Sequence, residues 1–341
     1  MGALAIAIPY VLFVWWFSTG SVLLLVGLSA RHGVLLKTGA TALFVASLAG
    51  IWASSQVTGA AGAYCVFTCA ILLWGAIEIS FLSGWITGPR PQPCPRDCAA
   101  VDRFWFALQA IAYHELALVV TAGLVFAVTA GAPNQLGLWT FAALLVLRQS
   151  AKVNLFLGVR TLNDELLPEH VAFLRSYFTR KPINTLFPFS VTLATAAAAI
   201  LAVTAIGVKS EFATLDCSLL AVLVALGALE HWFMILPMPV VDLWRWSIRS
   251  PAPAPASTVP AARPSLSVIS GAAGPKPPVV QMNAAALSRQ RLEDEFRQSY
   301  HAQACDPRHD ATTTKLGGLN VSTGATRFST GISRTADGRT T

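Results

Sequence analysis

Residues 60–82 read AAGAYCVFTCAILLWGAIEISFL, and Glu78 is the only charged side chain in this stretch. A helix needs about 20 mainly apolar residues in a row to cross the hydrocarbon core of a bilayer. The stretch meets this length. A carboxylate within such a helix is costly in lipid unless the interior of a bundle or a partner group receives it. These residues therefore predict a transmembrane helix with one polar group on its inner face.

The same pattern recurs on both sides of this stretch. Seven segments are long and apolar enough to be predicted as transmembrane helices: Ala5–Leu28, Thr38–Ala53, Ala60–Leu82, Phe104–Ala130, Leu136–Leu157, Leu186–Val208 and Leu219–Leu236. Hydrophobic residues make up 54% of the 341 positions and charged residues only 12%, whereas soluble domains carry about 25% charged residues. The predicted fold class is all-α, a polytopic membrane helix bundle of about seven transmembrane helices over residues 1–249.

Lysines and arginines lie almost only in every second connection. They follow the first, third, fifth and seventh predicted helices, at Arg31, Lys37, Arg90, Arg96, Arg103, Arg160, Arg175, Arg180, Lys181, Arg245 and Arg249. Positive residues accumulate on the cytoplasmic side of membrane proteins. We therefore expect a multi-pass protein of the bacterial inner membrane with a periplasmic N-terminus and a cytoplasmic C-terminus. The net charge of +7 is explained by this topology, so nucleic acid is not an expected partner.

The connections and the C-terminal region carry weaker signals. Residues 250–341 are rich in Pro, Ala, Gly, Ser and Thr, which predicts a disordered cytoplasmic tail with one short helix at 284–300. The connection Arg160–Phe187 has apolar residues at about helical spacing, so a helix on the membrane surface and an extension of the fifth helix both stay open. Cys94 and Cys98 form a CxxxC pair that lacks the further ligands of a zinc site.

The ionisable and polar side chains inside the predicted helices are the candidate site. They are Glu78, His114, Glu115, Arg148, Lys152, Asn154, Glu230 and His231. Arg148 and Lys152 are four residues apart, so they share one face of a helix and need anionic partners there. We expect Glu78, Glu115 and Glu230 to neutralise them. Two interpretations stay open: an ion-paired network that fixes helix packing, or a polar binding site.

The two histidines raise the question of a cofactor. The Glu-x-x-His spacing of di-metal carboxylate bundles is absent, and adjacent His and Glu residues point about 100° apart on a helix, so a metal site is not expected. A single imidazole can instead ligate the magnesium of a chlorin in an apolar pocket. His114 and His231 are the candidate ligands for such a pigment, and the alternative is that both are hydrogen-bonded packing residues.

Several functional classes are disfavoured by what the chain lacks. A retinal-type receptor needs a lysine in its last helix, and Leu219–Leu236 contains none. Transporters usually show two related halves or broken helices, and no internal repeat is evident. Walker A, Rossmann, G-x-S-x-G and H-E-x-x-H motifs are absent, so we expect a protein that is not an enzyme.

Read together, several motifs resemble the PuhE family, photosynthetic complex assembly proteins of purple phototrophic bacteria. The resemblance runs from Leu12 to Trp246 and rests on WWFSTG at 15–20, WGAIE at 74–78, GP at 88–89, AYHEL at 112–116, RQSAKVNLFLGVR at 148–160, LFP at 186–188 and LEHWF at 229–233. The chain after Arg249 departs from the family pattern. The family has no established catalytic residues, so none is carried over.

The resemblance implies an assembly factor for the reaction centre and core light-harvesting complex, linked to bacteriochlorophyll supply or insertion. Reaction-centre or light-harvesting subunits and pigment-synthesis enzymes are the implied partners, and bacteriochlorophyll or a precursor is the implied transient ligand. One alternative is a membrane-embedded metal-dependent enzyme that acts on a pigment or its prenyl tail. A further alternative is a transporter of a pigment precursor.

Overall fold

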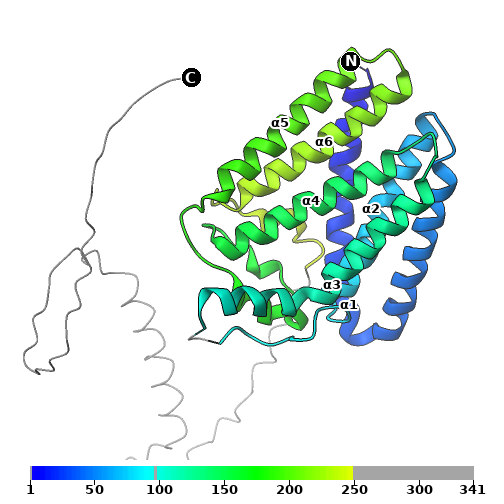
Figure 1. Cartoon of the computed structure of the whole chain (residues 1–341). Coiled ribbons are helices and arrows are strands. Elements are labelled where there is room, and N and C mark those ends of the chain that lie inside the picture. Colours follow the sequence, from blue (N-terminus) through cyan, green and yellow to red (C-terminus); the bar gives the residue numbers. More distant parts are fainter. Residues whose placement is uncertain (1, 96–97, 249–341) are drawn as a thin grey trace, which may run out of the picture. The chain divides into compact units, whose positions relative to one another are not determined.

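A computed structural model describes residues 2–95 and 98–248 (Figure 1). The predicted tail at 250–341 and its short helix at 284–300 lie outside these residues. The helices are α1 (Gly2–Ser54), α2 (Ala60–Leu82), α3 (Ala100–Thr129), α4 (Leu136–Leu157), α5 (Leu186–Gly207) and α6 (Glu211–Phe233). Three short 3₁₀-helices, η1 (Asp164–Leu166), η2 (Glu169–Tyr177) and η3 (Val240–Trp244), lie in the connections. The all-α fold class is confirmed.

Helix α1 contains the first two predicted membrane helices. Its two limbs, Gly2–Ser29 and Arg31–Ser54, run in opposite directions (Figure 1). They meet at His32, whose backbone is not helical (φ −129°, ψ 35°). The sequence predicted a connection from Leu28 to Thr38 at this point. In the structure the chain reverses direction at a much shorter interruption of the helix, at His32.

Within residues 2–95 and 98–248, six segments are long and apolar enough to cross a membrane: the two limbs of α1, and α2, α3, α5 and α6. The chain is therefore a multi-pass membrane protein. The remaining predicted segment, α4, is helical from Leu136 to Leu157 but does not reach the same hydropathy, because Arg148 and Lys152 interrupt it. The predicted orientation across the membrane stays a prediction.

Helix α6 begins eight residues earlier than the sequence predicted, at Glu211 rather than Leu219. The side chain of Ser210 caps the helix by accepting a hydrogen bond from the backbone N–H of Ala213, at 3.4 Å. Serine at this position satisfies one of the free N–H groups of the first turn, and the acidic Glu211 suits the positive end of the helix dipole. Hydropathy alone missed these polar first turns.

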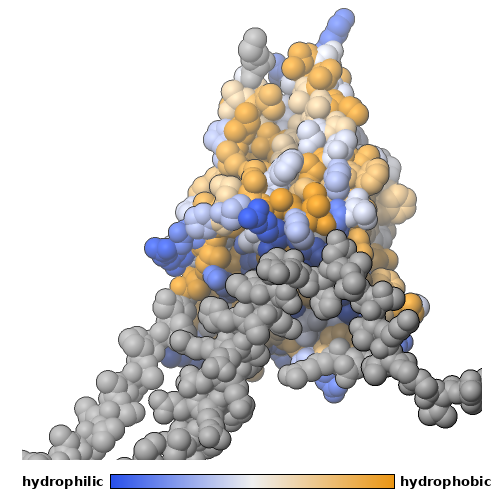
Figure 2. All heavy atoms as spheres, turned by 90° about the vertical axis from the view of Figure 1, so that its left-hand side faces the viewer, coloured by the Kyte–Doolittle hydropathy of each residue, from blue (hydrophilic) through white to orange (hydrophobic). Residues whose placement is uncertain are grey.

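Helix α2 forms the centre of the bundle. It contacts both limbs of α1 as well as α3, α4 and α6, and its buried side chains include Phe67, Leu73 and Trp74. The ring of Trp74 packs edge-on against Phe141 of α4, with centroids 5.4 Å apart. On the face that Figure 2 shows, hydrophobic side chains predominate in the upper part, and many strongly hydrophilic ones lie lower down.

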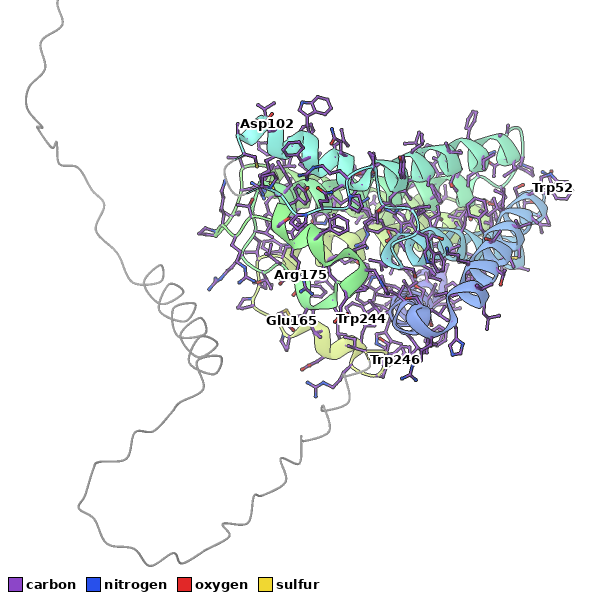
Figure 3. All side chains as sticks on the ribbon, turned by 90° about the horizontal axis from the view of Figure 1, so that it is seen from below. Trp52, Asp102, Glu165, Arg175, Trp244 and Trp246 are labelled. Carbon is purple, nitrogen blue, oxygen red and sulfur yellow. The ribbon has the colours of Figure 1, made fainter. Side chains whose placement is uncertain are left out.

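The long connections form a layer at that lower end, where Glu165, Arg175, Trp244 and Trp246 lie (Figure 3). The connection after α4 is not an extension of that helix, which ends at Leu157; it forms the short 3₁₀-helices η1 and η2, and a position of η2 on the membrane surface stays a prediction. Arg103 of α3 holds η2 in place by donating hydrogen bonds to the carbonyl of Tyr177 and the hydroxyl of Thr179.

The segment after α6 folds back onto the first limb of α1. The indole N–H of Trp244 donates to the carbonyl of Trp16 at 3.0 Å, and the indole N–H of Trp16 donates to the carbonyl of Leu243 at 2.9 Å. The ring of Trp246 lies against Gly20, where a Cβ would come within 2.2 Å of it. We call this reciprocal contact the tryptophan clasp. A side chain at position 20 would displace the ring of Trp246 from this contact.

Candidate functional site

The polar side chains predicted inside the membrane converge on the middle of the bundle, around α4. The first pair joins α4 to α2. The Nε atom of Arg148 lies 3.7 Å from Oε1 of Glu78. The Glu78 side chain is 9% exposed and that of Arg148 is 47% exposed. The carboxylate is therefore enclosed, and the cation reaches it from the edge of the bundle.

The second pair joins α4 to α3. The Nζ atom of Lys152 lies 2.6 Å from Oε1 of Glu115, and the side-chain amide of Gln149 donates to the other carboxylate oxygen. Both charged side chains are largely buried. A carboxylate that receives two donors from one helix orients that helix as well as neutralising its charge. The two cations of α4 thus pair with carboxylates on two different helices.

Glu230 of α6 takes a different partner from the one that the sequence suggested. Its carboxylate accepts a hydrogen bond from the indole N–H of Trp15 on α1. Among the residues in the structure it makes no ion pair within 4 Å. Glu230 therefore ties the last helix to the first, rather than closing a direct pair with Arg148 or Lys152.

His231, also on α6, uses both ring nitrogens. Its Nδ1 lies 2.7 Å from the carbonyl oxygen of Gly227, and its Nε2 lies 2.9 Å from the hydroxyl of Ser150 on α4. A carbonyl can only accept, so Nδ1 carries the proton and Nε2 accepts from the serine hydroxyl. In this arrangement no lone pair of His231 is free to ligate a metal or a pigment.

His114 of α3 is as deeply buried but has no polar partner. Its side chain is 0% exposed, and neither ring nitrogen makes a hydrogen bond to any described residue. The ring stacks on Phe81 of α2, with centroids 4.1 Å apart and an interplanar angle of 25°. The imidazole keeps a free lone pair, but protein atoms enclose it on all sides.

Asn154 links α4 to α5. Its side-chain amide donates to Ser190 at 3.0 Å, and its oxygen accepts from the amide of Asn184 at 3.0 Å. Asn184 in turn caps the start of α5 by accepting from the backbone N–H groups of Leu186 and Phe187. The predicted polar residues therefore connect α4 to α2, α3, α5 and α6. Such a network fixes the relative positions of the helices.

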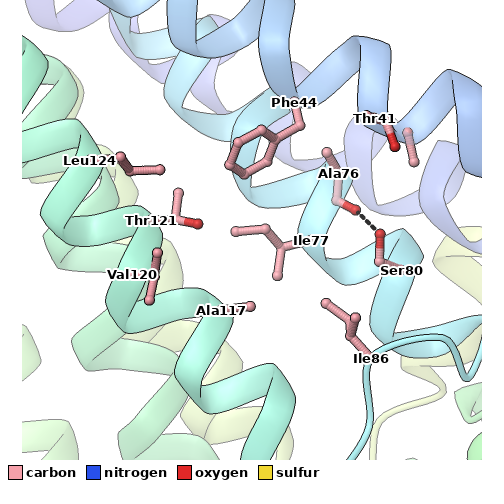
Figure 4. A pocket seen from close by; sticks show the side chains of 11 residues that line it. Thr41, Phe44, Ala76, Ile77, Ser80, Ile86, Ala117, Val120, Thr121 and Leu124 are labelled. Carbon is pink, nitrogen blue, oxygen red and sulfur yellow. Dashed lines mark hydrogen bonds between the residues drawn. The ribbon is translucent and has the colours of Figure 1, made fainter.

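A groove on the outside of the bundle lies next to this network (Figure 4). Its volume is about 310 Å³, and it runs between the second limb of α1, α2 and α3. Ala76 and Ser80 line one wall, and Ala117 and Thr121 line the other. None of the ionisable residues of the network belongs to its lining.

Neither a metal nor a chlorin finds a ready site at the predicted residues. In the part of the chain that the structure describes, no three His, Cys, Asp or Glu side chains lie close enough to hold a metal ion. His114 has the free nitrogen that a chlorin magnesium needs, but Phe81 covers its face and the groove does not reach it. A macrocycle therefore does not fit at either histidine without a movement of the helices.

Cys94 and Cys98 lie in the layer at the lower end. Their Sγ atoms are 3.1 Å apart, and the backbone N–H of Cys94 donates to the hydroxyl of Ser176 in η2 at 2.8 Å. Burial and the neighbouring thiol raise the pKa of Cys94 above its usual value. The two residues are free cysteines that lie against η2.

Two features escaped the sequence analysis. Asp216 lies inside α6, and its Oδ1 is buried without a hydrogen-bond partner among the described residues. It was missed because the predicted helix began at Leu219; the Ser210-x-x-Ala213 cap could have revealed it. The groove was missed because small residues on separate helices carry no signal of their proximity.

Comparison with known proteins gives a family but no activity. The family described as "Protein of unknown function (DUF3623)" matches residues 1–254. A relative from Rhodobacter capsulatus, described as an uncharacterized 30.4 kDa protein in the puhA 5′ region, is 37% identical over 256 residues. The alignment covers 73% of this chain and 93% of the relative. No solved structure matches the chain.

Proposed function

We propose, from the premise that this chain belongs to the DUF3623 family, that it is a non-enzymatic assembly factor for the photosynthetic reaction centre and core light-harvesting complex. Two findings support this direction. The relative from Rhodobacter capsulatus is named for its place in the puhA 5′ region. The motifs at 148–160 and elsewhere resemble the PuhE family of photosynthetic assembly proteins.

The observation that carries the proposal is the groove between α1, α2 and α3. Ala76 and Ser80 are four residues apart on one wall, and Ala117 and Thr121 are four apart on the other. Small residues at this spacing let the backbone of a neighbouring membrane helix approach closely, and they are enriched at helix–helix interfaces in lipid. The groove is therefore shaped for a transmembrane helix of a client subunit.

Thr121 gives the groove a polar contact. The side chain belongs to the lining of the groove and is 2% exposed. On the other wall, the hydroxyl of Ser80 donates a hydrogen bond to the carbonyl of Ala76 within its own helix, at 2.9 Å (Figure 4). A threonine hydroxyl in the wall of such a groove can hydrogen-bond to a docked helix in lipid, which strengthens helix association.

The ionisable network supports a structural rather than a catalytic role for the polar residues. Glu78, Glu115 and Glu230 each have a partner on another helix, and they lie outside the lining of the groove. The implied link to bacteriochlorophyll then runs through a client protein that carries the pigment. No step of the proposal places pigment on His114 or His231.

Filling the groove tests the proposal. The variant Ala117→Leu/Thr121→Leu puts bulk where the client helix would pack, and Val119→Leu is the matched control on the lipid-facing side of α3, where Val119 is 61% exposed. In a phototrophic host, near-infrared absorbance of membranes should show less assembled core complex for the groove variant alone, at equal levels of the protein. Normal assembly in the groove variant would refute the proposal.

A further inference from the structure

A second hollow lies at the lower end of the bundle, away from the groove. Its volume is about 460 Å³, and its lining is Arg160, Arg180, Lys181, Pro182 and Ile235. We call it the basic pocket. Three of its five residues are cations and none is acidic. The proposed docking of a client helix makes no use of it.

Backbone contacts bring the three cations together from the two ends of one connection, the segment between α4 and α5. Val159 and Arg180 form an isolated parallel β-bridge, with the N–H of Val159 donating to Thr179 at 3.1 Å and the N–H of Lys181 donating to Val159 at 3.1 Å. Gly158 precedes the bridge with φ 124°, a backbone conformation that favours glycine. The pocket is thus built on a hydrogen-bonded frame rather than on loose loops.

The apolar side of the pocket comes from the segment after α6. The N–H of Thr161 donates to the carbonyl of Met234 at 2.9 Å, which places Arg160 next to Ile235. Pro182 completes this side. A ligand in the pocket therefore meets cations on one side and hydrocarbon on the other.

The positive charge of the pocket is only partly neutralised. Arg180 lies 3.6 Å from Asp164, and its side chain remains 72% exposed. Arg160 and Lys181 form no ion pair with the residues included in the structure. Asp164 is shared with Arg175, whose guanidinium also holds the carbonyls of Asp164 and Leu167. At least two positive charges are therefore available to an anion.

The depth of the pocket follows from the helix ends around it. Arg160 comes three residues after the end of α4, Lys181 five residues before the start of α5, and Ile235 two residues after the end of α6. α5 and α6 are both apolar enough to cross a membrane. The pocket therefore lies at the level where the spans leave the hydrocarbon, which is where lipid phosphates are found.

We infer that the basic pocket binds the phosphate of an anionic phospholipid, with Arg160, Arg180 and Lys181 on the headgroup and with Pro182 and Ile235 against the upper acyl chains. Arginine pairs with phosphate through two parallel hydrogen bonds. Basic pockets between membrane helices bind anionic lipid headgroups in this way. The positive-inside rule explains why cations lie on the predicted cytoplasmic side of the membrane. It does not explain why three of them line a single pocket.

Native mass spectrometry of the full-chain protein in detergent tests this inference. Protein is mixed with phosphatidylglycerol or with phosphatidylcholine, and the one-lipid adduct is quantified. Wild type should prefer phosphatidylglycerol. The variant Arg160→Gln/Lys181→Gln should bind it about thirtyfold less, since each of the two cations near a headgroup contributes about 1 kcal/mol. The control Arg31→Gln/Arg245→Gln removes two exposed cations from the same predicted side and should bind as wild type does.

Three results would overturn the inference. One is equal binding of the two lipids by wild type, and another is an equal loss in the control variant. The third separates the two sources of phosphate: inorganic phosphate that displaces phosphatidylglycerol at equal concentration would make the pocket a site for a soluble phosphate. Because the substituted side chains are exposed, each variant should fold. A gel-filtration profile like that of wild type checks this.

Discussion

Helices α3 and α6 each carry a histidine beside a glutamate, and the bundle treats the two pairs in opposite ways. On α6, His231 has partners for both ring nitrogens, and Glu230 holds only an indole N–H. On α3, Glu115 holds Lys152 and Gln149, and His114 has no polar partner. In each pair, one side chain has two hydrogen-bonding partners. On α6 this side chain is the histidine, and on α3 it is the glutamate.

Burial alone therefore does not show how much a polar residue contributes to the stability of this bundle. His114 and His231 are 0% and 1% exposed, so exposure does not distinguish them. What matters is whether a removed side chain leaves a partner behind without a hydrogen bond or a counter-charge. The predictions below use this criterion to rank substitutions across the two pairs.

Glu115→Leu should have the largest effect. It leaves the ammonium of Lys152 without a counter-charge, at a cost of about 2–3 kcal/mol, which is below the range for fully buried pairs because the two side chains are 19% and 24% exposed. Unfolding by SDS titration in mixed micelles measures the change. The double variant Glu115→Leu/Lys152→Leu should cost less than the two single changes together. Additive costs would show that the two charges are not coupled.

His231→Leu should follow, with a loss of about 1–3 kcal/mol, because Ser150 loses its acceptor and the link between α4 and α6 is broken. The same titration applies. Ser150→Ala removes the other side of this bond and should cost less, since His231 keeps its bond to Gly227. If Ser150→Ala proves the more harmful of the two, the assigned roles of the two ring nitrogens are wrong.

Glu230→Gln should cost about 1 kcal/mol or less, because the amide oxygen can still accept from the indole of Trp15. Trp15→Phe, which removes the donor, is the informative control and should cost more than Glu230→Gln. Because the chain has ten tryptophans, the difference in fluorescence between the parent protein and Trp15→Phe during the titration reports on this contact. A large loss from Glu230→Gln would mean that its charge, rather than its hydrogen bond, stabilises the bundle.

His114→Leu should have the smallest effect and should leave stability unchanged or slightly raised. The substitution removes two buried nitrogens that have no hydrogen-bond partner, and it keeps an apolar side chain against Phe81. A clear destabilisation would show that the imidazole has a partner, such as a buried water or a bound ligand. His114→Leu and His231→Leu, measured side by side, are thus the sharpest test of the comparison.

The sequence predicted the membrane helices well because their signal is local. An apolar stretch such as 60–82 must be helical in lipid whatever surrounds it, since its backbone groups have no other partners. The members of the polar network were predicted for the same reason, because each charge within a span is costly by itself. The all-α bundle therefore follows from the apolar composition of the segments, and the polar network follows from the position of charged residues within them.

The partners of those residues could not be predicted, because they depend on which helices lie side by side. Glu230 was expected to neutralise a cation, and the structure gives it Trp15 from the opposite end of the chain. Helix ends were also missed where polar residues begin a helix, as at Glu211. The basic pocket combines both ends of the connection between α4 and α5 with Ile235 after α6, and these residues are far apart in the sequence.

The tryptophan clasp has a consequence for the order in which the protein is made. Trp16 and Trp244 are separated by 228 positions. The hydrogen bonds between the first limb of α1 and the segment after α6 therefore form only after the helices between them have been synthesised. Until then the space beside Gly20 stays open, and the first limb of α1 can be held only by its other neighbours. Synthesis of Trp244 and Trp246 therefore supplies the residues that close this contact with the first limb of α1.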